Sequence, residues 1–413
     1  MLLMASLPFN MFYSHIILIS YTIHSLIHLN KNSIRSIFSF RTLALQSVFF
    51  VTVLSSIYSI NPSAAFDEWG KHLTILLFPL LFCINPVDIK KYRPQLLLAF
   101  AFACTATIIY LYYDTFTTIH YYKLPFSKLF SPSFTNHNFS EPLSIHATFF
   151  SMQLVVALVY LLSLLIEKGP LHKKLPYLIC SIILIAGIIQ LSSKSIFITL
   201  LIAINIAIPY FLLRGKKRLR FIIISTSITV FAIVAIFNSG VFKERYVAEL
   251  RNDLSKSIHG APIDSRLSRW EVAIELIKTS PVIGYGAGSE IGLLQESFFN
   301  KKLFNSYLNR LNAHSEYLSF LLKSGIIGLL AYLSTLVFGF NIALKRKDLI
   351  FFTFMTMIAI ISLSENLLDV DKGIFFYAFF FSFFAFSTEG VVRIFVKAKK
   401  PVEVISEESE VLS

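Results

Sequence analysis

The stretch PYLICSIILIAGIIQLSSKSIFITLLIAINIAIPYFLL (176–213) decides the fold. It holds two apolar runs, 176–191 and 195–213, and its one charged residue, Lys194, lies in the polar turn between them. About 20 consecutive apolar residues suffice for an α-helix to cross the hydrocarbon core of a bilayer. The stretch therefore predicts two membrane-spanning helices joined by a short turn.

Similar apolar stretches recur along the whole chain of 413 residues. Hydrophobic residues make up 55% of the chain and charged residues only 15%, which excludes a soluble globular domain and a disordered chain. We expect an all-α, polytopic integral membrane bundle of about 11–12 transmembrane helices with one large outer loop. The predicted spans lie at roughly 8–28, 42–60, 73–85, 95–113, 144–166, 176–191, 195–213, 221–238, 318–344, 349–364 and 373–395.

The basic residues predict the orientation of these spans. Most of them lie in alternate connections, at 31–41, 90–93, 168–174, 214–220, 345–347 and 393–400. Basic loops stay in the cytoplasm, so the N-terminus and the long connections 114–143 and 239–317 are expected outside. The net charge of +13 is thereby explained without a nucleic acid partner. The first apolar stretch lacks a basic flank and a small-residue cleavage site, and we expect a retained helix.

This orientation divides the chain into four parts. Residues 1–238 form the N-terminal part of the transmembrane bundle, with about eight helices. Residues 239–317 form the large outer loop with amphipathic helices, 318–395 the C-terminal transmembrane helices, and 396–413 a cytoplasmic tail. The three Cys lie apart inside apolar stretches, so we expect no disulfide, no metal and no cofactor.

Unusual polar residues collect on the predicted outer side. Lys194 lies in the turn LSSKS, and a lone Lys between apolar helices is often a residue that reaches toward the membrane surface. On the outer side, however, a basic residue is not needed to set the orientation of the protein in the membrane. The alternative hypothesis is therefore that Lys194 binds an anion. The acidic residues Glu365, Asp369 and Asp371 lie in the last outer loop and would be the ligands if a divalent metal were required.

The segment DSRLSRWEVAIELIKTSPVIGYGAG (264–288) predicts an amphipathic helix that Asp264 or Ser265 caps and Pro281 ends. Arg266 and Arg269 lie three residues apart in its first turn. They either meet lipid phosphates at the membrane surface or, beside free helix amides, cradle a phosphate ligand. We interpret GYGAG as a turn.

Two histidines stand at the start of predicted spans. His314, with Glu316 two residues later, either ends a helix as a polar cap or acts as a general base near neutral pH. His146 has the same two interpretations with fewer polar neighbours. His146 and Glu316 are therefore accessory candidates.

Taken in order, these segments resemble the O-antigen ligase and lipid-linked polysaccharide polymerase family of bacterial inner-membrane glycosyltransferases. The resemblance rests on SSKS (192–195), SRLSRWEVAIELIKTSPVIGYGAGS (265–289), NAHSEYLSFLLKSGIIGLLAYL (312–333) and SENLLDVDKGIFF (364–376). It implies a multi-pass protein of the inner membrane whose large loop and active site face the periplasm.

The resemblance also implies the reaction. Such ligases move a glycan from undecaprenyl pyrophosphate to a lipid A-core acceptor, with inversion and without a metal or a nucleotide sugar. By matching motif, Arg266 corresponds to the family's pyrophosphate-binding loop arginine and His314 to its base. Members of the family commonly have Arg at the position of Lys194. A guanidinium can bind a phosphate through two N–H groups, whereas the ammonium group of Lys acts as a point charge.

Two alternatives remain open. A polymerase of lipid-linked repeats, or a protein O-oligosaccharyltransferase, would share these motifs and differ in the acceptor. A lipid or solute transporter would instead show inverted repeats and charged residues at mid-span, and the sequence shows neither convincingly.

Overall fold

The computed structural model describes residues 1–29, 37–85, 87–238, 240–255 and 264–387. Within these ranges the regular elements are helices, which confirms the predicted all-α class. The predicted cytoplasmic tail and the last residues of the final span lie outside them.

Each predicted span coincides with a long helix or a broken one. These helices are α2 (Met11–Ile27), α4 (Phe40–Ser56), α5 (Pro62–Ile84), α6 (Ile89–Tyr121), α8 (Ala147–Ile166), α9 (Leu171–Leu191), α10 (Lys194–Ile202) continued by η4 (Ala203–Ala207) and α11 (Ile208–Leu212), α12 (Gly215–Asn238), α18 (Glu316–Arg346), α19 (Leu349–Ile361) and α20 (Asp371–Ser387). Six helical stretches in the described part of the chain are long and apolar enough to cross a membrane, and α2, α4 and α19 are shorter apolar helices.

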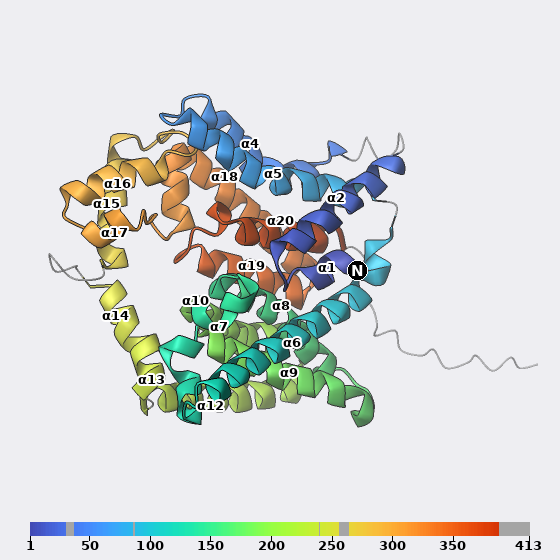
Figure 1. The fold of residues 1–413 in the computed structure, drawn as a ribbon. Coiled ribbons are helices and arrows are strands. Elements are labelled where there is room, and N and C mark those ends of the chain that lie inside the picture. The colour runs from blue at the N-terminus through green and yellow to red at the C-terminus, as the bar shows by residue number, and fades with distance from the viewer. Residues whose placement is uncertain (30–36, 86, 239, 256–263, 388–413) are drawn as a thin grey trace, which may run out of the picture.

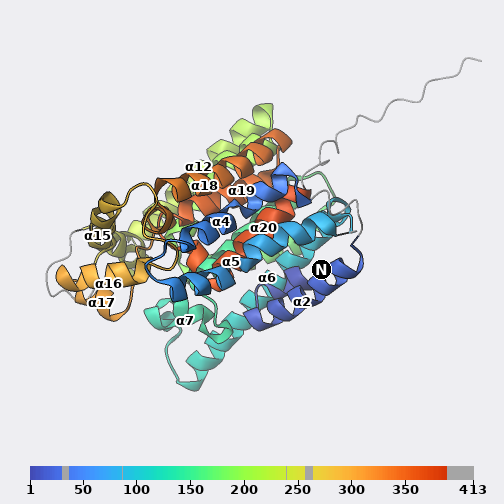
Figure 2. The ribbon, with the colours of Figure 1, turned by 90° about the horizontal axis from the view of Figure 1, so that it is seen from above.

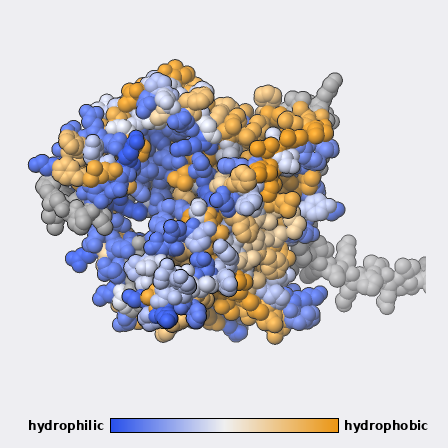
Figure 3. All heavy atoms as spheres, in the orientation of Figure 1, coloured by the Kyte–Doolittle hydropathy of each residue, from blue (hydrophilic) through white to orange (hydrophobic). Residues whose placement is uncertain are grey.

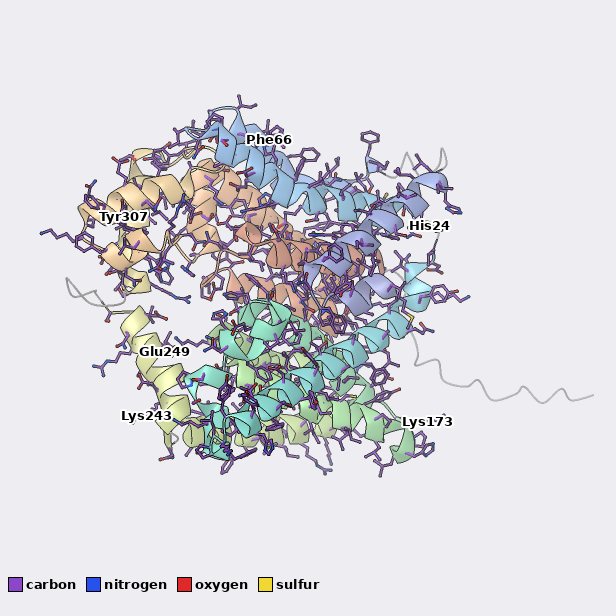
Figure 4. The ribbon with its side chains drawn as sticks, viewed as in Figure 1. His24, Phe66, Lys173, Lys243, Glu249 and Tyr307 are labelled. Carbon is purple, nitrogen blue, oxygen red and sulfur yellow. The ribbon has the colours of Figure 1, made fainter. Side chains whose placement is uncertain are left out.

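The long helices pack into one bundle, and the helices of the large loop gather at one end of it (Figures 1 and 2). These loop helices are α13 (Gly240–Lys243), η5 (Glu244–Ala248), α14 (Glu249–Asp253), α15 (Arg266–Thr279), α16 (Glu290–Asn300) and α17 (Phe304–Leu308). Figure 4 shows Glu249 and Tyr307 at this end and Lys173 and His24 at the opposite end. The basic connection at 168–174 therefore lies away from the large loop, as the charge pattern predicts.

Hydropathy follows the same division. In Figure 3 the side chains near α15–α17 are largely hydrophilic, while apolar side chains cover much of the rest of the visible face. The centre of the bundle is filled by α8 and α20. The first fifteen residues of α8 are all buried, as are Phe375, Phe376, Phe380 and Phe384 of α20. A helix that is apolar on every side belongs in such a position.

The N-terminal stretch departs from the prediction. A short helix, α1 (Leu2–Ser6), ends before Pro8, and Asn10 caps the separate helix α2 by accepting a hydrogen bond from Phe12 N at 3.0 Å. Met1 lines a cavity of about 580 Å³ together with Val87 and Tyr92, beside the basic connection 90–93. The predicted span 8–28 contains α2, which begins beside the last loop, since Lys372 Nζ donates a hydrogen bond to the carbonyl of Phe9 at 2.7 Å. The short helix α1 before Pro8 was not predicted, and the side of the membrane on which the N-terminus lies stays a prediction.

The large loop is docked onto the bundle by its glycine turn. Gly284, Gly286 and Gly288 all have positive φ, and a Cβ on Gly286 would lie 2.2 Å from Ser59 Cα. A Cβ on Gly288 would meet the backbone of Ala64 at 2.4 Å. This confirms the interpretation of GYGAG as a turn, and it explains the glycines by close backbone approach to the α4–α5 connection.

Three further helices complete the end of the bundle that carries the large loop. They are α7 (His137–Ser140) and the 3-10 helices η3 (Glu141–Leu143) and η6 (Leu367–Asp369). Two 3-10 turns, η1 (Phe126–Phe130) and η2 (Pro132–Phe134), join α6 to α7. The ends of α6, α8, α10, α18, α19 and α20 meet there with the loop helices, so this end brings together the segments that carry the candidate residues.

Candidate functional site

Lys194 and Arg266 share one carboxylate partner. Lys194 begins α10, and Ser265 caps α15 by accepting a hydrogen bond from Ser268 N at 3.2 Å, which places Arg266 at the first position of that helix. Lys194 Nζ lies 3.3 Å from Asp253 Oδ2, and Arg266 Nε lies 3.6 Å from the same oxygen. The two cations predicted from separate segments are therefore neighbours.

The helix α14 supplies a second carboxylate to Lys194. Glu249 Oε2 lies 3.3 Å from Lys194 Nζ, and both side chains are partly exposed. Ion pairs with this exposure contribute little to stability, with a median of about 0–1 kcal/mol. A bound anion could therefore replace these partners at small cost to the fold.

Arg266 also reaches the last outer turn of the chain. Its Nη1 donates a hydrogen bond to the carbonyl of Ser364 at 2.5 Å, and its Nη2 lies 3.6 Å from Glu365 Oε1. The hydroxyls of Ser195 and Ser364 are 2.6 Å apart, which links the start of α10 to the same turn. The starts of α10 and α15 thus converge on residues 364–365.

His314 faces the other oxygen of Glu365. The distance from His314 Nδ1 to Glu365 Oε2 is 3.3 Å. Burial raises the pKa of Glu365, but the hydrogen bond with His314 and the charges of His314 and Arg266 lower it to about 2. When His314 is in its uncharged form, an ionised Glu365 that accepts a hydrogen bond from Nδ1 leaves Nε2 as a proton acceptor. His314 is not the helix cap, because Ser315 occupies that position.

Arg269 is buried beside Arg266 with unused donors. Its exposure is 5%, and its Nε and Nη1 have no hydrogen-bond partner among the described residues. Burial, together with the charge of Arg266, lowers the pKa of Arg269 to about 10. Buried donors without a partner are costly to the fold, so these two N–H groups are candidates to bind an anion.

His146 lies at the edge of this group. It precedes α8 without a capping hydrogen bond, and its ring centroid lies 4.1 Å from that of His137. Burial lowers the pKa of His146 to about 4, against the opposing charge of Glu365. His146 is thus uncharged at neutral pH, and it would interact with the charge of Glu365 only after it is protonated.

A second polar cluster, which we call the Lys323 cluster, lies beneath the site. Lys323 Nζ lies 2.6 Å from Asp369 Oδ1, 3.2 Å from Glu68 Oε1 and 3.6 Å from Glu290 Oε2. Glu316, the second accessory candidate, is buried nearby, and its Oε2 accepts a hydrogen bond from Leu368 N at 2.8 Å. The contacts of Glu316 thus hold α18 to η6.

The acidic residues of the last outer loop do not form one group. Glu365 lies with His314 and Arg266, whereas Asp369 lies with Lys323. Across the part of the chain that the structure describes, no three His, Cys, Asp or Glu side chains are arranged to hold a metal ion. The need for a metal is a question for a chelation experiment.

Sequence reasoning missed three parts of this arrangement. It placed Glu365 in an outer loop without pairing it with His314, and it did not single out Asp253 or Lys323. The signal available for Lys323 was a lone cation between apolar residues in SFLLKSGII. No comparable signal existed for Asp253, since it lies in a strongly polar segment.

Comparison with known families agrees with this geometry. Residues 179–333 match the family Wzy_C, described as O-Antigen ligase, and no curated protein matches the chain. The matched segment contains Lys194, Arg266, Arg269 and His314. The chain is therefore a polytopic membrane protein that carries the domain of the O-antigen ligase and polymerase family at residues 179–333.

Proposed function

We propose that the protein is a glycosyltransferase that moves a glycan from undecaprenyl pyrophosphate to a lipid A-core or similar acceptor at the periplasmic face of the inner membrane. The observation that carries this proposal is the buried guanidinium of Arg269, whose Nε and Nη1 have no hydrogen-bond partner in the described part of the chain and which lies near Arg266 and the His314–Glu365 pair. An anion site and a base thus lie side by side, as transfer from a phosphate-linked donor requires.

The charges of the site suit a diphosphate diester, which carries two negative charges. Lys194, Arg266 and Arg269 supply three positive charges, and Glu365 holds one negative charge. A second buried carboxylate, Asp264, also acts on Arg269, and it accepts a hydrogen bond from Ser306 N at 2.7 Å. The carboxylates Glu249 and Asp253 pair with Lys194 at partly exposed positions. When donor phosphates replace these two carboxylates, the net charge of the site does not change, because two charges of the same sign substitute for two others.

His314 serves as the base in this proposal. The acceptor hydroxyl oxygen attacks the anomeric carbon of the donor glycan, and its proton passes to His314 Nε2. The bond between the anomeric carbon and the pyrophosphate oxygen breaks, and its electron pair leaves with that oxygen. Glu365 stabilises the imidazolium that forms, and the three cations stabilise the charge that grows on the pyrophosphate.

This single displacement inverts the anomeric carbon. It uses no covalent enzyme intermediate, and side-chain cations do what a divalent metal does in other phosphate chemistry.

The test is transfer by purified protein in nanodiscs from an undecaprenyl-pyrophosphate-linked donor to lipid A-core. NMR of the product linkage should show inversion. Retention would refute the single-displacement mechanism.

The acceptor and the orientation need cellular tests. In a deletion strain, loss of polymer from lipid A-core supports a ligase, single-repeat caps indicate a polymerase, and normal glycans indicate a transporter. For orientation, Asn309→Cys and Lys173→Cys would be compared in a cysteine-free background with an impermeant reagent on spheroplasts. Both residues are exposed, and we expect labelling of the first only.

A further inference from the structure

His314 occupies a backbone conformation that needs support. Its φ is +48°, in the left-handed region that residues other than glycine rarely adopt. Such a conformation persists when surrounding contacts determine it. In this protein the supporting contacts come from the residues on either side of His314.

The two neighbouring backbone amides donate to two buried side chains. Ala313 N donates to Glu290 Oε1 at 3.0 Å, and Ser315 N donates to Asn366 Oδ1 at 2.8 Å. Glu290 is 1% exposed and Asn366 is 3% exposed. Water therefore cannot readily substitute for either acceptor.

The two acceptors are bonded to each other. Asn366 Nδ2 donates to both oxygens of Glu290, at 3.0 and 3.2 Å, and also to Asp369 Oδ2 at 2.8 Å. An amide whose oxygen faces a backbone N–H and whose nitrogen faces carboxylates has one consistent orientation. We call this Glu290–Asn366 pair the amide clamp.

The amide clamp also sets the position of Glu365. Asn366 follows Glu365 directly in the chain, and its side chain holds Ser315, which directly follows His314. One residue thus fixes both sides of the 3.3 Å contact between His314 Nδ1 and Glu365 Oε2. If Asn366 moves, the imidazole and its carboxylate partner move apart.

We propose that Asn366 and Glu290 are positioning residues that hold His314 in its reactive orientation toward Glu365. The inference rests on the proposed function, since it assigns these residues through the role of His314. A displacement of about 1 Å at a reacting group can cost on the order of a hundredfold in rate. Loss of the amide clamp should therefore lower kcat while donor binding, which depends on the cations, is retained.

The experiment compares Asn366→Ala with Glu68→Gln in nanodiscs. Glu68 belongs to the Lys323 cluster and accepts from Gly288 N at 2.6 Å, but its hydrogen bonds do not involve residues 312–316. Asn366→Ala should lower kcat about ten- to hundredfold with the donor KM within about twofold. Glu68→Gln should lower Tm and keep kcat within about threefold. If Asn366→Ala and Glu68→Gln have the same Tm and lose the same amount of kcat, the proposal is overturned.

Glu290 provides a second test that does not depend on Asn366→Ala folding. Glu290→Gln keeps one acceptor oxygen, for Ala313 N and for one of the two contacts with Asn366 Nδ2, and loses the acceptor at the other oxygen. Its kcat should therefore fall less than that of Glu290→Ala, which should fall as that of Asn366→Ala does. If Glu290→Gln is as inactive as Glu290→Ala at equal Tm, hydrogen bonding to the backbone is not the cause, and the proposal fails.

His314→Ala in the same assay separates this inference from the proposed function. Inactive His314→Ala with a fully active Asn366→Ala would refute the amide clamp alone. Active His314→Ala would refute the role of His314 as base, on which the clamp rests.

Discussion

Replacement of Arg269 by Met should make the protein more stable and less able to bind its donor. In the folded state, burial and the charge of Arg266 lower the pKa of Arg269 to about 10, well below the usual value for arginine. This difference means that the fold disfavours the charged guanidinium by about 3 kcal/mol relative to water. Met keeps a similar length and removes the charge, so the free energy of unfolding should rise by roughly 1–3 kcal/mol.

The same substitution should weaken donor binding. The Nε and Nη1 donors, which have no partner among the described residues, are available to phosphate oxygens. A hydrogen bond to a charged group contributes roughly 1.5–3 kcal/mol, so donor affinity should fall on the order of ten- to a hundredfold.

Thermal unfolding of the purified protein, with and without undecaprenyl pyrophosphate, measures both effects. Lys278→Met is the matched control, because Lys278 lies on the same helix and is exposed. Arg269→Met should raise Tm without ligand and reduce the ligand-induced rise, and Lys278→Met should do neither. If Arg269→Met lowers Tm and leaves the ligand-induced rise intact, Arg269 supports the fold and does not bind the donor.

Four further predictions concern the same site. Lys194→Arg should keep substantial transfer activity, Lys194→Gln should lose roughly ten- to a hundredfold, and Lys194→Glu should be inactive although inserted; equal rates for Gln and Arg would remove Lys194 from the site. His314→Ala should abolish transfer but retain donor binding, and His146→Ala should cause a milder loss; near-normal transfer by His314→Ala would contradict a base. Glu365, whose pKa falls from 4.5 to about 2, should contribute stability that is complete above pH 4.5 and is lost as pH falls toward 2. In Glu365→Gln, Tm should fall less steeply between pH 4.5 and 2 than it does in the unmodified protein. Transfer should survive a chelator, and inhibition that magnesium or manganese reverses would require a metal after all.

The helices were predictable because each is determined locally. An apolar run of about 20 residues has no other stable form in a bilayer, so runs such as 144–166 and 176–191 predict helices without knowledge of their neighbours. The same holds for α15, where Ser265 caps the helix as its position before the amphipathic pattern predicts. The first predicted span, 8–28, contains α2, but the short helix α1 before it was not predicted, because hydropathy alone does not register the reversal of the chain between Pro8 and Asn10.

The pairing of side chains was decided by tertiary structure. From the alternation of basic loops alone, Lys194, Arg266, Arg269 and His314 were predicted to lie on one side of the membrane, and the structure brings the segments that carry them to one end of the bundle. The sequence did not determine that Glu365 meets His314 across 51 residues, or that Asp253 meets Lys194 across 59. Such contacts depend on how helices pack laterally, and many packings satisfy the same hydropathy pattern. Nor did it distinguish the ion-paired Arg266 from the buried Arg269, whose Nε and Nη1 have no partner within the ranges that the structure describes, because burial is set by neighbouring elements and not by position along a helix.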